Sequence, residues 1–118
     1  MVINMICGNG GDGGGYSILK TASYSSSTLS IVLPSQPKLV IVTLRSGSIA
    51  ANGMFAYASL DPDTGVYVSR IQTRASGSAV TWTDVDQYAV WNEETKTFSM
   101  RVRSGTSASG TCTCHAVG

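Results

Sequence analysis

Charged side chains are scarce in this sequence. They make up 13% of its 118 residues, against about 25% in an average soluble domain, and the formal net charge is +1. A chain without a basic surface has little attraction for the phosphates of nucleic acid or for anionic lipids, so we expect it to bind neither. Because soluble monomers normally carry many surface charges, we also expect other subunits to cover part of this surface.

Long apolar runs and a basic N-terminal segment are lacking too. No run approaches the roughly 18 residues that a membrane span requires. Residues 1–6 carry no basic side chain, which a secretory signal would have. We therefore expect neither membrane insertion nor a secretory signal.

Cysteine and histidine are rare, with three cysteines and one histidine in the chain. Three unevenly spaced cysteines do not make a disulfide framework, and they suit a protein that folds in a reducing cytoplasm. Cys112, Cys114 and His115 stand close together, but in a strand the two cysteines share one face and the histidine points to the other. Because a zinc site needs four convergent ligands, we expect no bound metal and two cysteines that face the core.

Glycine is concentrated near the N-terminus. Residues 8–15 read Gly-Asn-Gly-Gly-Asp-Gly-Gly-Gly and contain the pattern G-x-G-x-x-G. A dinucleotide site needs a helix directly after this pattern, whereas the residues that follow have no helical period, so we expect no bound cofactor. We interpret residues 1–15 as an apolar N-terminal arm with a Gly-rich hinge, and residues 16–118 as the main domain.

The rest of the composition favours strands. Glu and Lys are few, whereas Val, Ile, Thr and aromatic residues are frequent. Short strand-like runs between Ser, Gly, Asn and Asp clusters predict an all-β fold, an antiparallel β-sandwich of about seven to nine strands. Residues 28–33 and 97–103 alternate and predict half-buried strands. Residues 38–44 form a continuous apolar run, which predicts a central strand buried on both faces.

Turn signals divide the second half of the chain into hairpins. Residues 61–65 read Asp-Pro-Asp-Thr-Gly, with glycine where a turn tolerates positive φ. Residues 75–78 and 92–96 are further turn candidates. From Met54 onward we therefore expect a meander of antiparallel strands joined by short hairpin turns.

One constellation combines carboxylates with aromatic rings between positions 82 and 91. It has three interpretations: a general acid and base, a sugar-binding patch whose rings pack on pyranose faces, or a turn whose aspartates cap backbone donors while the tryptophans fill the core. The sequence leaves all three open, with binding expected from loops at residues 45–53, 74–78 and 84–88. The candidate ligand-binding residues are Arg74, Trp82, Asp84, Asp86, Tyr88 and Trp91.

Two segments carry a family resemblance. Residues 33–42 read Leu-Pro-Ser-Gln-Pro-Lys-Leu-Val-Ile-Val, and the chain closes with Phe-Ser-Met-Arg-Val at 98–102, a Ser/Gly loop and Cys-His-Ala-Val-Gly at 114–118. Residues 28–118 resemble the small β-domains of tailed-phage and prophage structural proteins, which are similar in outline to the H-type lectin sandwich. The chain departs from that pattern where Cys112 and Cys114 replace aromatic residues, and where no fibre shaft precedes the domain.

The resemblance implies a non-enzymatic virion protein, assembled in the host bacterial cytoplasm. It would be a homotrimeric tail-fibre or tail-tip module that binds host cell-surface polysaccharide. The missing shaft favours a separate gene product and an alternative function, a capsid decoration or assembly protein. In that case residues 1–15 would bind other virion proteins by adding a strand to a neighbour's sheet. A third hypothesis, a hydrolase built on Asp84 and Asp86, is not expected.

Overall fold

The computed structural model describes residues 15–44, 55–74, 80–84, 88–102 and 109–118. The predicted arm and hinge, apart from Gly15, lie outside the described residues, as does the predicted turn at 75–78. Every element of the described part is a strand. The strands are β1 (Ser17–Ser25), β2 (Thr28–Val32), β3 (Leu39–Leu44), β4 (Phe55–Leu60), β5 (Tyr67–Arg74), β6 (Val80–Asp84), β7 (Ala89–Asn92), β8 (Thr97–Arg101) and β9 (Gly110–Val117).

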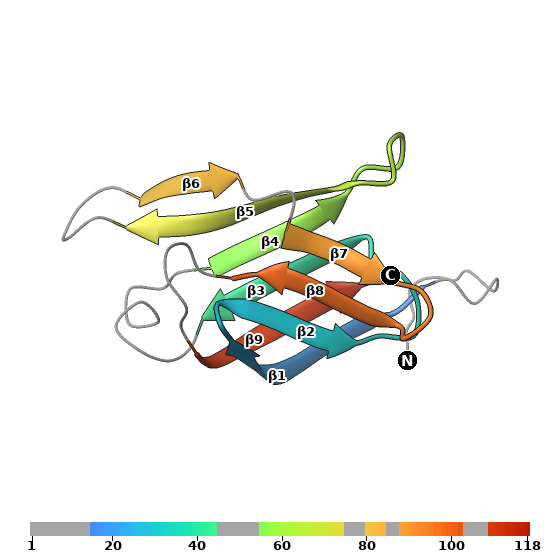
Figure 1. Ribbon diagram of the computed structural model, residues 1–118, viewed down its shortest axis with the longest axis horizontal. Helices are drawn as coiled ribbons and strands as arrows, with labels where there is room; N and C mark the ends of the chain where they lie inside the picture. Colours follow the sequence, from blue (N-terminus) through green and yellow to red (C-terminus); the bar gives the residue numbers. More distant parts are fainter. Residues whose placement is uncertain (1–14, 45–54, 75–79, 85–87, 103–108) are drawn as a thin grey trace.

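All of these strands belong to one antiparallel sheet, in the order β6-β5-β4-β3-β9-β1-β2-β8-β7. The sheet bends back on itself, so that β5 contacts β7 although the two strands stand near opposite ends of this order (Figure 1). The antiparallel all-β fold expected from the sequence is confirmed, and the nine-stranded sheet lies within the expected range. The strands on either side of this bend are the two halves of a single hydrogen-bonded sheet.

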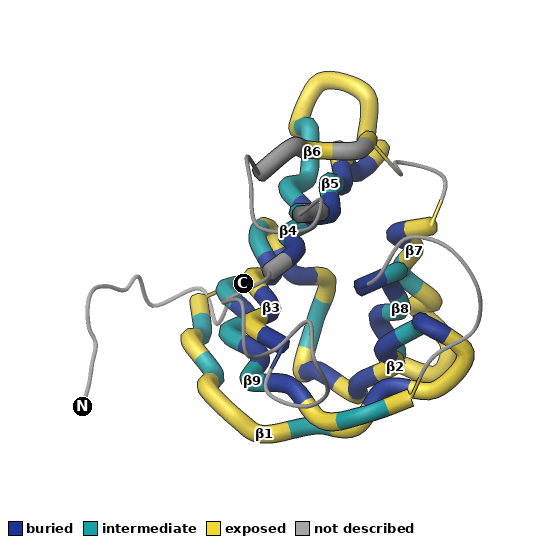
Figure 2. Tube along the Cα trace, turned by 90° about the vertical axis from the view of Figure 1, so that its left-hand side faces the viewer, coloured by how far each residue is buried: buried dark blue, intermediate teal, exposed yellow. Residues whose placement is uncertain are grey.

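The core lies between these two halves, and the strands show the period-2 burial that such a position requires. In β2, Leu29 and Ile31 are buried, and in β8, Phe98 and Met100 are buried. Figure 2 shows buried and exposed residues alternating along the strands around a common interior. The alternation predicted for residues 28–33 and 97–103 is therefore confirmed in their described parts.

Strand β3 corrects one expectation, because it is buried on one face only. Val40, Val42 and Leu44 point into the core, whereas Ile41 and Thr43 are exposed on the outer face. The sequence predicted burial on both faces from the continuous apolar run. In a bent antiparallel sheet no second layer covers the outer face, so an apolar residue there stays exposed to solvent.

The predicted turns at 61–65 and 92–96 are present. Gly65 has a φ of 75°, and the Asp61 carboxylate accepts a hydrogen bond from the backbone N–H of Asp63 at 2.9 Å. In the second turn, the side-chain oxygen of Asn92 accepts the backbone N–H groups of Glu94 and Thr95 at 3.0 and 3.2 Å. These local hydrogen bonds hold the β4–β5 and β7–β8 hairpins in register.

The predicted meander is interrupted at two points. Strands β4, β5 and β6 follow one another as neighbours, and so do β7 and β8. Between β6 and β7, however, the chain passes from one edge of the sheet to the other, and β9 returns to pair with both β1 and β3. This last strand buries Cys112, Cys114 and Ala116 in the core. Its position between β1 and β3 therefore follows from the burial of these side chains and not from a local turn.

Two tyrosine hydroxyls fix the connection between β2 and β3. Tyr16 donates to the carbonyl oxygen of Ser35 and Tyr67 donates to that of Pro37, each at 2.6 Å. Burial raises the pKa of both phenols to about 12. The proline-containing segment that follows β2 is thereby held by one side chain from β5 and one from the residue directly before β1.

No helix in the described part of the chain is both long and apolar enough to cross a bilayer.

Candidate functional site

The outer face of β4, β5 and β6 brings together one group of side chains with binding chemistry. In the ladder, Tyr57 of β4 pairs with Arg70 of β5, and Arg70 pairs with Asp84 of β6. Residues that pair directly across an antiparallel ladder lie on the same face of the sheet. Trp82 stands two residues before Asp84 and therefore shares this outer face. We call Tyr57, Arg70, Trp82 and Asp84 the outer-face cluster.

Arg70 and Asp84 form an ion pair at the surface. The distance from Arg70 Nε to Asp84 Oδ1 is 2.7 Å, and the two side chains are 44% and 68% exposed. The Nε atom is itself buried and makes no hydrogen bond, so the contact is electrostatic rather than a directed hydrogen bond. At this exposure, solvent screens the pair and its contribution to stability is small.

Trp82 supplies an aromatic surface next to this ion pair. Its ring packs edge-on against Tyr57, with centroids 5.6 Å apart and an interplanar angle of 65°. Trp82 is one of the two tryptophans of the chain, and it is 42% exposed. The edge-on contact fixes the orientation of the indole.

The other predicted aromatic residues lie at the opposite edge of the sheet. Tyr88, directly before β7, is 51% exposed, and the guanidinium carbon of Arg101 lies 4.8 Å from the centre of its ring. Trp91 in β7 packs against the core, and its indole N–H donates to Glu93 Oε1 at 2.8 Å. Strand β7 is the last in the sheet order and β6 is the first, and the bend of the sheet brings β5 into contact with β7.

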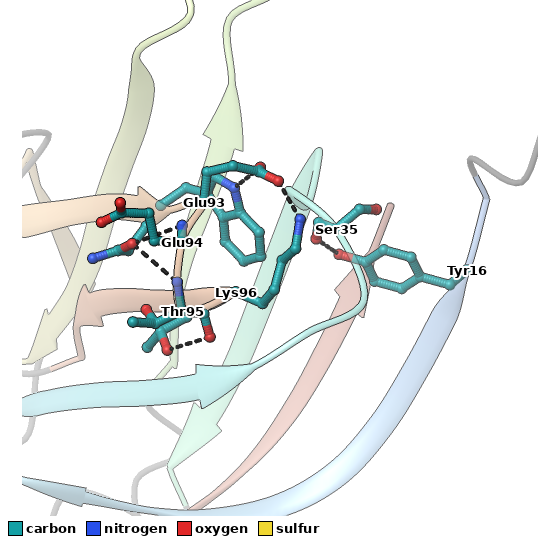
Figure 3. Close-up of polar contacts among 9 residues, drawn as sticks. Tyr16, Ser35, Glu93, Glu94, Thr95 and Lys96 are labelled. Carbon is teal, nitrogen blue, oxygen red and sulfur yellow. Dashed lines mark hydrogen bonds and ion pairs between the residues drawn. The ribbon is translucent and has the colours of Figure 1, made fainter.

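Glu93 connects Trp91 to the β7–β8 turn, because its carboxylate contacts both Trp91 and Lys96. Its second carboxylate oxygen forms an ion pair with Lys96 (Figure 3). The pKa of the Glu93 carboxyl is lowered, first by the hydrogen bond from Lys96 and then by the one from Trp91. These contacts fit the third interpretation in the case of Trp91, whereas Trp82 is 42% exposed and does not fill the core.

The candidate residues predicted from the sequence stand on the two end strands of the sheet order or next to them. Trp82 and Asp84 lie together at one edge of the sheet, whereas Tyr88 and Trp91 lie at the other. For Arg74 the structure describes the backbone, at the end of β5 opposite Val80. Asp86 lies outside the described residues, and so do most of the loops in which binding was expected, at 45–53, 74–78 and 84–88.

Two members of the outer-face cluster, Tyr57 and Arg70, were missed by sequence reasoning. They lie in separate strands from Trp82, and only the β4–β5–β6 register places them beside it. The single usable signal was the pair of hairpin turns predicted around β5. With the registers assigned, those turns place residues 57, 70 and 84 in one cross-strand row.

A second polar pair on the outer face was also missed. The Ser17 hydroxyl and Nε2 of His115 are hydrogen-bonded at 2.8 Å across β1 and β9. Both residues lie on the outer surface of the sheet. Nucleophilic catalysis needs a base that is itself held in place and donors that stabilise the developing charge. The pair alone does not supply these.

Cys112 and Cys114 are free, fully buried thiols on the core face of β9, as the sequence predicted. Burial raises the pKa of both, in the case of Cys114 to about 11. Within the described ranges no group of three or more His, Cys, Asp or Glu side chains is placed to hold a metal ion.

No protein-family model, curated protein or solved structure gave a significant match to this chain.

Proposed function

We propose that this chain is a non-enzymatic saccharide-binding module of a tailed-phage virion, and that it binds host cell-surface polysaccharide through the outer-face cluster. The observation that carries the proposal is the exposed Trp82 ring beside the Arg70–Asp84 ion pair. Of the candidate residues predicted from the sequence, Trp82 and Asp84 belong to the outer-face cluster.

The chemistry of the cluster fits a sugar ring. The apolar C–H face of a pyranose packs on an exposed aromatic surface, while its hydroxyl groups need both donors and acceptors at the edge of that surface. Guanidinium nitrogens donate only and a carboxylate accepts only, so Arg70 and Asp84 together satisfy hydroxyls in both roles. A rigid strand backbone under all of these residues keeps them at fixed spacing.

The virion part of the proposal has different support. It rests on the resemblance of residues 28–118 to tailed-phage structural domains and on the charge-poor composition, with 13% charged residues. Both favour a protein that works inside an assembly, and we propose a homotrimer. Light scattering after gel filtration should give the mass of three chains, and a monomer mass at all concentrations would contradict the trimer.

The saccharide part is tested by binding to a panel of purified bacterial surface polysaccharides. We expect saturable binding to at least one of them, and a loss of at least about tenfold in affinity for Trp82→Ala. Leu19→Ala is the matched control, because Leu19 is 69% exposed on the outer face of the same sheet but lies in β1, far from β6 in the strand order. Equal losses in both variants, or no binding at all, would contradict the proposal.

A second candidate function is favoured by apolar side chains exposed outside the cluster. Leu19, Val32, Val68 and Val90 are 69%, 67%, 45% and 55% exposed, and they are spread over both halves of the sheet. Such surface suits contact with other virion proteins, as a capsid decoration or assembly protein would make. Deleting residues 1–15 should then abolish incorporation into particles and leave the sheet folded, whereas normal incorporation would contradict this function.

A further inference from the structure

Within the outer-face cluster, the charges of Arg70 and Asp84 cancel at a distance of 2.7 Å. Strands β4, β5 and β6 contain one further charged residue, Arg74, and the structure describes only its backbone. Among the described side chains of these strands, Arg70 and Asp84 are the charged ones. Tyr57, Gln72 and Trp82, the neighbours in the ladder, are uncharged. The cluster is therefore polar without a net charge in its described part.

We infer that the cluster selects uncharged saccharides over acidic ones, and that Asp84 is the residue that sets this selectivity. The inference rests on the proposed function and adds the class of ligand to it. A neutral sugar offers hydroxyl groups, each of which accepts from a guanidinium N–H and donates to a carboxylate oxygen. The adjacent donors of Arg70 and acceptor of Asp84 match that double role.

An acidic sugar meets the same pair differently. Its carboxylate would form a favourable charge-assisted contact with the guanidinium of Arg70, which is the residue type best suited to hold it in a bidentate manner. Asp84 already lies against Arg70 and is 68% exposed, so its negative charge repels a second carboxylate brought to the same place. Removing the charge of Asp84 leaves Arg70 without its partner and converts a neutral site into a cationic one.

The experiment uses the full chain and three matched pairs of oligosaccharides. Each pair consists of a hexose oligomer and the corresponding hexuronate oligomer, in the gluco, galacto and manno configurations, so that its members differ by the oxidation of C6 to a carboxylate. Calorimetry gives the ratio of dissociation constants within each pair for the wild type, for Asp84→Asn and for Asp63→Asn. Asp63 is an exposed carboxylate in the β4–β5 turn, so its substitution makes the same change in net charge away from the cluster.

We expect the wild type to bind the neutral member of at least one pair about tenfold more tightly than the hexuronate, and Asp84→Asn to remove or reverse that preference. The Asp63→Asn variant should keep the preference for the neutral member. A wild type that binds hexuronates as tightly as hexoses overturns this inference while leaving saccharide binding intact, and so does a preference that Asp84→Asn leaves unchanged. Failure of the wild type to bind any of these oligomers overturns the proposed function itself.

Discussion

The ring of Tyr67 in β5 packs edge-on against the ring of Phe98 in β8, with centroids 5.2 Å apart and an interplanar angle of 68°. These two strands do not pair, and they stand near opposite ends of the sheet order. The contact therefore joins the two halves of the bent sheet across the core. Its position explains why one continuous ladder can enclose a hydrophobic interior in the described part of the chain.

Truncation of this contact should be costly. Phe98 is 0% exposed and is the largest of the fully buried side chains. Phe98→Ala removes the ring and leaves a cavity between the sheet halves, so we expect the free energy of unfolding to fall by about 3–5 kcal/mol. Urea denaturation monitored by circular dichroism measures this. A loss below about 1 kcal/mol would show that the halves do not pack through this residue.

Alkaline pH should destabilise the fold through its buried tyrosines. The pKa of Tyr16 and Tyr67 is about 12 in the folded chain, against 10.0 for an unperturbed tyrosine. The folded state therefore keeps these protons while the unfolded state releases them. The stability that they contribute is complete below pH 10 and is lost as the pH rises from 10 through 12.

The double variant Tyr16→Phe/Tyr67→Phe separates this effect from the titration of other groups. It should be less stable at neutral pH, because the carbonyl oxygens of Ser35 and Pro37 lose their donors. Its free energy of unfolding should fall less steeply than that of the wild type above pH 10. Parallel curves for the two proteins in this range would contradict the assignment.

The thiols of β9 should be inert in the folded protein. Cys112 and Cys114 are fully buried, and burial raises the pKa of both, which disfavours the reactive thiolate. In a Cys7→Ser background, a disulfide reagent at pH 8 should leave the native protein unmodified and should label both remaining cysteines once guanidinium is added. Rapid labelling of the native protein would show that β9 is not held between β1 and β3.

One buried hydroxyl is a site for stabilisation. Ser69 in β5 is 0% exposed, faces the core opposite Ala58, and its hydroxyl has no hydrogen-bond partner among the described residues. Ser69→Ala removes a desolvated polar group without leaving a large cavity. We expect the free energy of unfolding to stay unchanged or to rise by about 1 kcal/mol, whereas a clear loss would indicate a partner for this hydroxyl.

The features that the sequence predicted correctly are those that depend on local periodicity. Alternation along residues 28–33 and 97–103 identified the core faces of β2 and β8, and turn chemistry identified the hairpin that ends at Gly65. The apolar run of β3 was misread, because a run of apolar residues does not tell whether a second layer covers its other face. In a bent single sheet, Ile41 remains outside.

The candidate site was only half predictable for a related reason. The sequence placed aromatic and acidic residues in one window, but Trp82 stands on the outer face of β6, whereas Trp91 in β7 packs against the core. Conversely, Arg70 and Tyr57 reach Trp82 and Asp84 through ladder registers that no local pattern encodes. Long-range pairing, rather than the choice of residue types, decides which side chains meet.

The chain has two tryptophans, so the fluorescence of a Trp91→Phe variant reports on Trp82 alone. Titration of this variant with the neutral hexose oligomers tests most directly whether saccharides bind at the outer-face cluster. We expect a saturable change in emission for at least one oligomer, with the same dissociation constant that calorimetry gives. Calorimetric binding without any change in the emission of Trp82 would contradict the location of the site, and the absence of both signals would contradict saccharide binding.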